Sequence, residues 1–286
     1  IRTSLKDIKT DGLITINDLE ELIMKRKSIL IPHFGYTGRP DYAADILLSG
    51  RFIIIIDGSP TVLIAPVTLT FLIRTSEDNF SLKLQSFFSI VFRYFGLLIS
   101  LLLPGLWTAL LSFNPDQLPY TMLATILLSR LGVPFQLPIE IFIMIFLFDI
   151  FKEASLRMPG PLGQTLSVVG GLIIGQAAIS AGLTAPGVLV VIAVSVVASF
   201  TIINQELSIA IRVLRLFNVL FSSLFGLIGF FLSSFAILTY LVNIKSFGVP
   251  FLSPFSPYNS KEFFSALGHI PKYLKGKKTN IDAEKR

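Results

Sequence analysis

The sequence predicts a multi-pass α-helical membrane protein with four to six spans, possibly including one re-entrant region, and a small soluble α/β part at its N-terminal end. Hydrophobic residues make up 52% of the chain and charged residues only 15%, whereas about a quarter of an ordinary soluble domain is charged. The mean hydropathy is +0.74. Charged residues are also unevenly spread, which indicates one region in water and another in lipid.

We expect three regions along the chain. Residues 1–85 carry most of the acidic groups and form the C-terminal part of a soluble cytoplasmic α/β domain, residues 86–244 form the transmembrane domain, and residues 245–286 form a basic cytoplasmic tail. Because the first residue is Ile1, we expect the sequence to begin inside a longer protein.

The composition argues against several classes of site. There is no cysteine, which excludes disulfides, thiolate nucleophiles and cysteine-based metal sites. The two histidines, His33 and His269, lie near no carboxylate cluster with ligand spacing, so we expect neither imidazole catalysis nor a metal enzyme, and no cofactor. The net charge of +6 comes mainly from the ends of apolar segments and the tail, a pattern that favours a membrane surface over nucleic acid.

The N-terminal region predicts two helices and a hairpin. An amphipathic stretch over residues 17–27 indicates a helix with Asn17 as its N-cap. Pro40 and Gly50 mark the start and stop of a helix over residues 40–48. The β-rich runs 51–56 and 61–65 flank a turn-forming Asp-Gly-Ser-Pro segment, which predicts a β-hairpin.

Uncharged segments predict the membrane helices. Residues 94–115 form a first span with Pro104-Gly105 inside it, where we expect neighbouring helices to satisfy the freed backbone groups. Residues 118–151 are interrupted by prolines and charges, so a re-entrant or interfacial helix pair fits as well as a span. Residues 158–205 predict a transmembrane hairpin, and residues 216–244 exceed the bilayer core and must tilt, kink or protrude.

Positive charges predict the orientation of the membrane domain. Arg74, Lys83 and Arg93 precede the first span and the tail is basic, so both ends should be cytoplasmic and the number of crossings even. Lys152 and Arg157 are cytoplasmic only if residues 118–151 make one crossing, which conflicts with four secure spans elsewhere. The predicted number of membrane crossings is therefore four to six.

Small residues mark a close-packing helix face. Gly171 and Gly175 form a GxxxG pattern, and such patterns let helices approach closely. Ordinary intramolecular packing and an oligomer or pore-lining role fit this pattern about equally. The candidate pore or helix-packing residues are Gly170, Gly171, Gly175, Gln176 and Gly226.

Polar residues at lipid depth form a second candidate set, because such groups tend to face a bundle interior or an aqueous path. The set consists of Glu140, Asp149, Gln164 and Asn204. Glu140 and Asp149 could border a cation pathway, although interfacial residues beside short helices are the favoured interpretation.

The loop containing Pro159, Gly160, Pro161 and Gly163 lacks the lysine and the preceding strand of a phosphate-binding loop. It therefore predicts a rigid turn into the next membrane helix.

Several motifs are shared with a known family. They are Gly38-Arg39-Pro40-Asp41, Asp57-Gly58-Ser59-Pro60, Gly132-Val133-Pro134-Phe135, residues 157–164, Val169-Gly170-Gly171, Gly175-Gln176, and Ser246-Phe247-Gly248-Val249-Pro250. In this order they resemble the GerA family, the A subunits of spore germinant receptors, from about residue 30 onward. The stage V sporulation protein AF type shares these motifs. One departure is Gly38, where the family pattern has an acidic residue before Arg39.

The resemblance implies a subunit of the spore inner membrane that acts with a transporter-like B subunit and a lipoprotein C subunit. It also implies a homo-oligomeric ring that conducts ions when nutrients are sensed, and no enzymatic activity. Two other functions compete with this one. A secondary transporter predicts inverted repeats, of which we find no convincing example, and a structural scaffold would only hold partner subunits.

Overall fold

The computed structural model describes residues 16–24, 30–79, 82–158 and 161–256, which fall into two compact units. The first unit combines the chain up to Val91 with Ile203–Ala210 and the chain from Thr239 onward. The second consists of Phe92–Ile202 and Ile211–Leu238.

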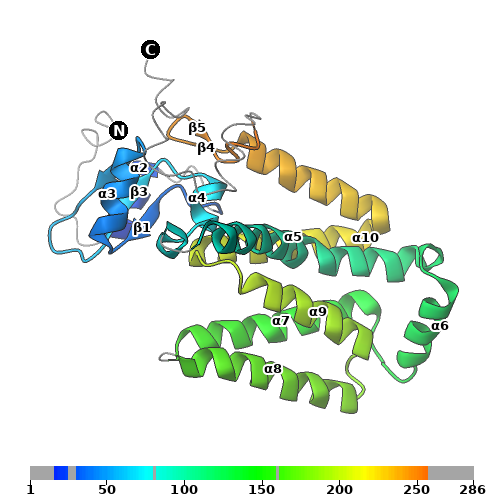
Figure 1. The fold of residues 1–286 in the computed structure, drawn as a ribbon. Helices are drawn as coiled ribbons and strands as arrows, with labels where there is room; N and C mark the ends of the chain where they lie inside the picture. The colour runs from blue at the N-terminus through cyan, green and yellow to red at the C-terminus, as the bar shows by residue number, and fades with distance from the viewer. Residues whose placement is uncertain (1–15, 25–29, 80–81, 159–160, 257–286) are drawn as a thin grey trace. The chain divides into compact units, whose positions relative to one another are not determined.

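The first unit contains a small antiparallel sheet with helices (Figure 1). Its elements in chain order are α2 (Ile16–Met24), β1 (Gly35–Thr37), α3 (Pro40–Leu48), β2 (Phe52–Ile54), β3 (Val62–Ala65), α4 (Leu69–Ile73), a 3-10 helix (Ser76–Asn79), β4 (Lys245–Ser246) and β5 (Val249–Pro250). The sheet order is β1-β3-β2, so β3 is central and pairs antiparallel with both neighbours.

The predicted helix over residues 40–48 and the predicted hairpin are confirmed. Pro40 begins α3, and Phe52 pairs with Ala65 across the hairpin of β2 and β3. The prediction that Asn17 caps its helix is wrong, because α2 already includes Ile16 and Asn17 therefore lies inside the helix. Strand β1 was not predicted, since a strand of three residues is too short to show a period.

The second unit is a helical bundle. Its elements are α5 (Lys83–Phe113, which begins in the first unit), a 3-10 helix (Pro115–Gln117), α6 (Tyr120–Ser129), α7 (Leu137–Leu156), α8 (Pro161–Ser180), α9 (Pro186–Ser199) and α10 (Gln205–Asn243, whose ends belong to the first unit). By length and composition, two of the described helices could cross a membrane: Leu84–Phe113 and Gln205–Asn243. Helix α9 has 14 residues and rises only about 21 Å.

Contacts fix the directions of α7 and α9. Glu140 near the start of α7 bonds Ala185 at the start of α9, and Lys152 near the end of α7 bonds Ser199 at the end of α9. These two helices are therefore parallel, and the connecting α8 lies antiparallel to them (Figure 1). Residues 158–205 were predicted to form a transmembrane hairpin, and the structure has two helices there, α8 and α9; their crossing of a membrane stays a prediction.

Helix α5 runs antiparallel to α9. The Ser195 hydroxyl donates to the Ser100 carbonyl oxygen at 3.0 Å, and farther along α5 a Cβ at Gly187 would lie 3.6 Å from Trp107. From the first contact to the second, residue numbers rise along α5 and fall along α9. The two helices therefore run in opposite directions.

Helix α10 is a helical hairpin that reverses at Gly226. A first arm (residues 205–225) and a second arm (residues 227–243) are joined by Gly226, whose φ of 62° and ψ of −140° are not helical. Asn218 Nδ2 donates to Ser233 Oγ at 2.9 Å, whereas a continuous helix would separate these residues by about 22 Å. Figure 1 shows the two arms in yellow and orange. The uncharged segment 216–244 is thus folded back on itself.

Candidate functional site

Asp149 forms a buried ion pair with the first arm of α10. Arg215 Nη2 donates to Asp149 Oδ1 at 2.7 Å and to Oδ2 at 2.8 Å, and the two side chains are only 3% and 13% exposed. Arg212 lies farther away, with its Nε 3.8 Å from Asp149 Oδ1. Both charges sit in a low-dielectric interior, where a paired arrangement avoids the cost of an isolated ion. The sequence indicated Asp149 as a polar residue at lipid depth, but it gave no sign that Asp149 meets Arg215.

Glu140 links three helix ends in the second unit. Its Oε1 accepts hydrogen bonds from the Thr184 hydroxyl at 2.8 Å and from the Ala185 N–H at 2.6 Å, at the N-cap of α9. Arg130, which caps the C-terminus of α6, places Nη2 3.1 Å from Glu140 Oε2. The carboxylate is 1% exposed. A negative charge at a helix N-terminus is stabilising, so this buried carboxylate joins α6, α7 and α9.

The glycine face of α8 turns toward the rest of the bundle. A Cβ at Gly171 would lie 2.9 Å from the Phe148 ring on α7, and one at Gly175 would lie 2.8 Å from Leu189 on α9. A Cβ at Gly170 would lie 3.3 Å from the Phe151 ring on α7. These contacts allow close approach of α8 to its neighbours within one chain. A pore-lining role for the three glycines remains a prediction.

The opposite face of α8 is exposed and partly polar. It carries Ile173, Gln176, Ala177 and Ser180, which follow the i, i+3, i+4, i+7 spacing of one helix face. Gln176 therefore points away from the glycines that adjoin it in the sequence.

The other predicted polar residues have simpler positions. Asn204 caps α10, because its Oδ1 accepts a hydrogen bond from the Leu207 N–H at 2.8 Å. The side chain of Gln164 lies outside the described residues, as do Pro159 and Gly160 of the predicted turn. Pro161 and Gly163 lie in the first turn of α8.

Pro104 is accommodated as the sequence predicts. A proline has no N–H to donate to the carbonyl four residues earlier, so Pro104 leaves the Ser100 carbonyl without its helical partner. Ser195 of α9 supplies the missing donor at 3.0 Å, with both serines buried. The sequence indicated that a neighbouring helix must provide this donor but did not identify Ser195.

Asn218 connects α5 with both arms of α10, and sequence reasoning missed it. The Ser233 and Ser234 hydroxyls both donate to the Phe230 carbonyl, so their oxygens accept from Asn218 Nδ2 at 2.9 and 3.1 Å. A Cβ at Gly105 would overlap Asn218 Oδ1. An asparagine within an apolar run was the available signal, since such a residue tends to face a bundle interior.

In the first unit, Tyr36 connects α2 with the start of α10. Its hydroxyl donates to Glu20 Oε2 and also hydrogen-bonds the side chain of Glu206. Burial raises the pKa of the Glu20 carboxyl, although the Tyr36 hydrogen bond partly opposes this shift. Burial also raises the pKa of Tyr36 itself, with further contributions from Glu20 and Glu206. Residues far apart in the sequence thus share one polar cluster.

The hairpin of β4 and β5 docks onto the N-terminal part of the first unit. Phe247 adopts a positive φ of 50° at the turn, and its ring packs edge-on against Phe34 and Phe52 at centroid distances of 5.3 Å. The buried Ser246 hydroxyl donates to the His33 carbonyl at 3.0 Å and accepts from the Val67 N–H at 3.1 Å. Residues 245–256, which begin the predicted tail, therefore belong to the first unit.

We expect Ser246→Ala to loosen this docking by roughly 2 kcal/mol, because it leaves two buried backbone groups without partners. Hydrogen–deuterium exchange at Val67 should accelerate accordingly. Ser223→Ala is the matched control, since its hydroxyl only bonds the Leu220 carbonyl of its own helix at an exposed position. Equal exchange at Val67 in the wild type and Ser246→Ala would contradict the docking role.

Comparisons with known proteins agree with the motif resemblance. A sequence profile described as "Bacillus/Clostridium GerA spore germination protein" matches residues 1–281. Spore germination protein XA of Bacillus anthracis is 49% identical over 95% of this chain and 55% of its own length. Spore germination protein KA of Bacillus subtilis is 34% identical over 95% of this chain and 50% of its own length. The uncharacterized membrane protein YfkQ of Bacillus subtilis is 35% identical over 90% of the chain and 50% of its own length.

No solved structure matches this chain significantly. The chain spans about half the length of the curated relatives it matches. The profile covers nearly all of the chain, and these three relatives are at least 34% identical to it over at least 90% of its length. On this basis, the chain belongs to the GerA family of spore germination proteins.

Proposed function

We propose that this chain is the membrane part of a germinant-receptor A subunit, which oligomerises to form a gated ion path in the spore inner membrane. Nutrient sensing by a transporter-like B subunit, together with a lipoprotein C subunit, would open this path and trigger germination. The membership of the GerA family and the names of the relatives support the role in germination.

The observation that carries the ion path is the exposed face of α8. Gln176 and Ser180 lie on this exposed face beside Ala177 and Ile173, and no described element of the chain covers them. The glycines on the other side let α8 pack tightly against α7 and α9, so the partly polar face of α8 is open to neighbouring copies. Several copies that brought this face together would surround a polar path.

The bundle supports a topology with six passes. Residues 203–210 and 239–256 share a compact unit with residues 30–79, so these segments lie on one side of the membrane and the passes between them are even in number. Helices α5, α7, α8 and α9 and the two arms of α10 supply six. Residues 200–204 complete the pass that the short α9 begins.

This topology resolves the conflict in the charge pattern. With α10 counted as two passes, the number of passes between them places Lys152 and Arg157 on the same side of the membrane as Arg74 and Lys83. That is the distribution expected when the side carrying the first unit is cytoplasmic.

This sequence contains no cysteine, so a cysteine on the α8 face would be the only thiol in this part of the protein, and the full-length protein without it shows any effect of the reagent elsewhere. The full-length protein carrying Gln176→Cys would be produced with its partner subunits in non-sporulating cells, and potassium efflux measured before and after a charged methanethiosulfonate reagent. We expect the reagent to reduce nutrient-triggered efflux severalfold, because it would attach a bulky charge inside the path.

Val194→Cys is the matched control, since Val194 is 45% exposed on α9 but lies on a different helix. Efflux that is insensitive to the reagent at position 176, and equally so at position 180 in Ser180→Cys, would refute a path along α8. No efflux with any combination of subunits would favour a scaffold. A Gly171→Leu variant is less informative, because its side chain would clash with Phe148.

A further inference from the structure

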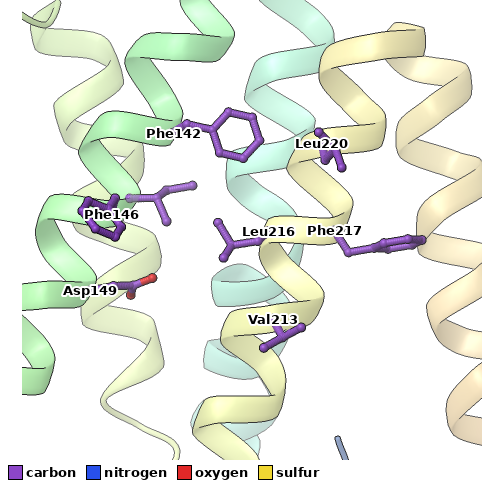
Figure 2. A pocket seen from close by; sticks show the side chains of 8 residues that line it. Phe142, Phe146, Asp149, Val213, Leu216, Phe217 and Leu220 are labelled. Atoms are coloured by element: carbon purple, nitrogen blue, oxygen red, sulfur yellow. The ribbon is translucent and has the colours of Figure 1, made fainter.

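An apolar groove lies between α7 and the first arm of α10. It has a volume of about 560 Å³, and its lining includes Phe142, Phe146 and Asp149 from α7 and Val213, Leu216 and Leu220 from α10 (Figure 2). Several of these apolar side chains are well exposed, Phe146 at 69% and Leu220 at 46%. The groove is therefore open to whatever surrounds the bundle along this face.

One end of the groove carries an excess of positive charge. Asp149 is the only charged residue in the lining, and it is paired with Arg215 and approached by Arg212. The neighbouring charges on α7 are Lys152 and Glu153. Glu153 is also paired with Arg157, at 3.3 Å. Four cations therefore lie around two carboxylates, and positive charge exceeds negative charge at this end of the groove, which is costly at membrane depth.

The arginine donors at this end are not saturated within the described part of the chain. Arg215 Nε is buried without a hydrogen-bond partner there. Arg212 Nε is 3.8 Å from Asp149 Oδ1 and its Nη1 is 3.7 Å from Glu153 Oε2, distances too long for hydrogen bonds. Guanidinium groups bind phosphate oxygens especially well.

We propose that this groove binds an anionic phospholipid, with its phosphate at Arg212 and an acyl chain along the apolar wall. A phospholipid complements this site at both ends. Its negative phosphate matches the positively charged end of the groove, and its acyl chain matches the apolar wall. Asp149 keeps Arg215 in place, since both of its carboxylate oxygens accept from Arg215 Nη2, which leaves the more exposed Arg212 to meet the headgroup. Under the six-pass topology this headgroup belongs to the cytoplasmic leaflet.

The test compares lipids on the purified full-length protein in mild detergent. Phosphatidylglycerol should raise the unfolding temperature by several degrees, and phosphatidylcholine by less than half as much. Arg212→Gln should remove the preference for the anionic lipid, and Leu216→Trp, which fills the groove, should reduce stabilisation by both lipids. Lys245→Gln, which removes an exposed cation of the first unit, should retain the wild-type response.

Two results would overturn the proposal. One is equal stabilisation of the wild type by both lipids. The other is a disulfide between two copies carrying Phe146→Cys, which would assign the groove to a second copy of the chain. Neither the unfolding temperature nor the crosslink depends on ion flux. These results can therefore contradict the lipid site without contradicting the ion path, and efflux results can contradict the ion path without contradicting the lipid site.

Discussion

Replacing Asp149 by leucine should lower the free energy of unfolding by about 3–5 kcal/mol, because the buried Arg215 would keep its charge and lose its partner. The Arg215 side chain is 3% exposed, so water cannot substitute for the lost carboxylate. The loss should appear as a reduced denaturant midpoint of the purified full-length protein in mild detergent.

The double variant Asp149→Leu with Arg215→Met should recover most of this loss, since no charge would then be left unpaired. The exposed pair of Glu153 and Arg157, with side chains 48% and 79% exposed, is the control. Glu153→Gln should change stability by no more than about 0.5 kcal/mol. If the double variant were as unstable as Asp149→Leu alone, the unpaired charge would not be the cause.

Gly226→Val should destabilise the protein by about 3 kcal/mol and open the α10 hairpin. The backbone there has a positive φ that a β-branched residue rarely adopts, and a Cβ would lie 2.7 Å from the Phe113 side chain. Asn218→Cys and Ser233→Cys, introduced together into the cysteine-free chain, should form a disulfide when Gly226 is kept. The disulfide yield should fall severalfold in Gly226→Val.

Gly187→Ala is the control for a methyl group added to a helix of the same unit, because its Cβ would meet Trp107 at an ordinary 3.6 Å. It should leave both stability and crosslinking unchanged. A full disulfide yield in Gly226→Val would mean that the reversal does not depend on the glycine backbone.

Local chemistry made parts of this fold predictable. Proline at the first position of α3 and the Asp-Gly-Ser-Pro turn between β2 and β3 act within a few residues, so the sequence locates these elements closely. The long uncharged segments likewise predict a membrane protein, because the cost of placing charges in lipid leaves a clear compositional mark.

The candidate site was only partly predictable. The sequence selected Glu140, Asp149 and the glycines of α8 by residue type, but it gave no sign of which side chain each one meets. Arg215 pairs with Asp149, and Ser195 pairs with Ser100, each across more than sixty residues of chain. Such pairings leave no local pattern in the sequence.

The sequence by itself determined the membrane class, the family, the α3 helix, the β2–β3 hairpin and the need for a donor opposite Pro104. These depend on composition, motifs and interactions between near neighbours. Only the tertiary structure decided that α10 reverses at Gly226, that the α8 glycines face inward while Gln176 faces outward, and that residues 245–256 join the N-terminal unit. A glycine is compatible with a straight helix or a reversal, and the choice is made by contacts with distant residues such as Asn218, Ser233 and Phe113.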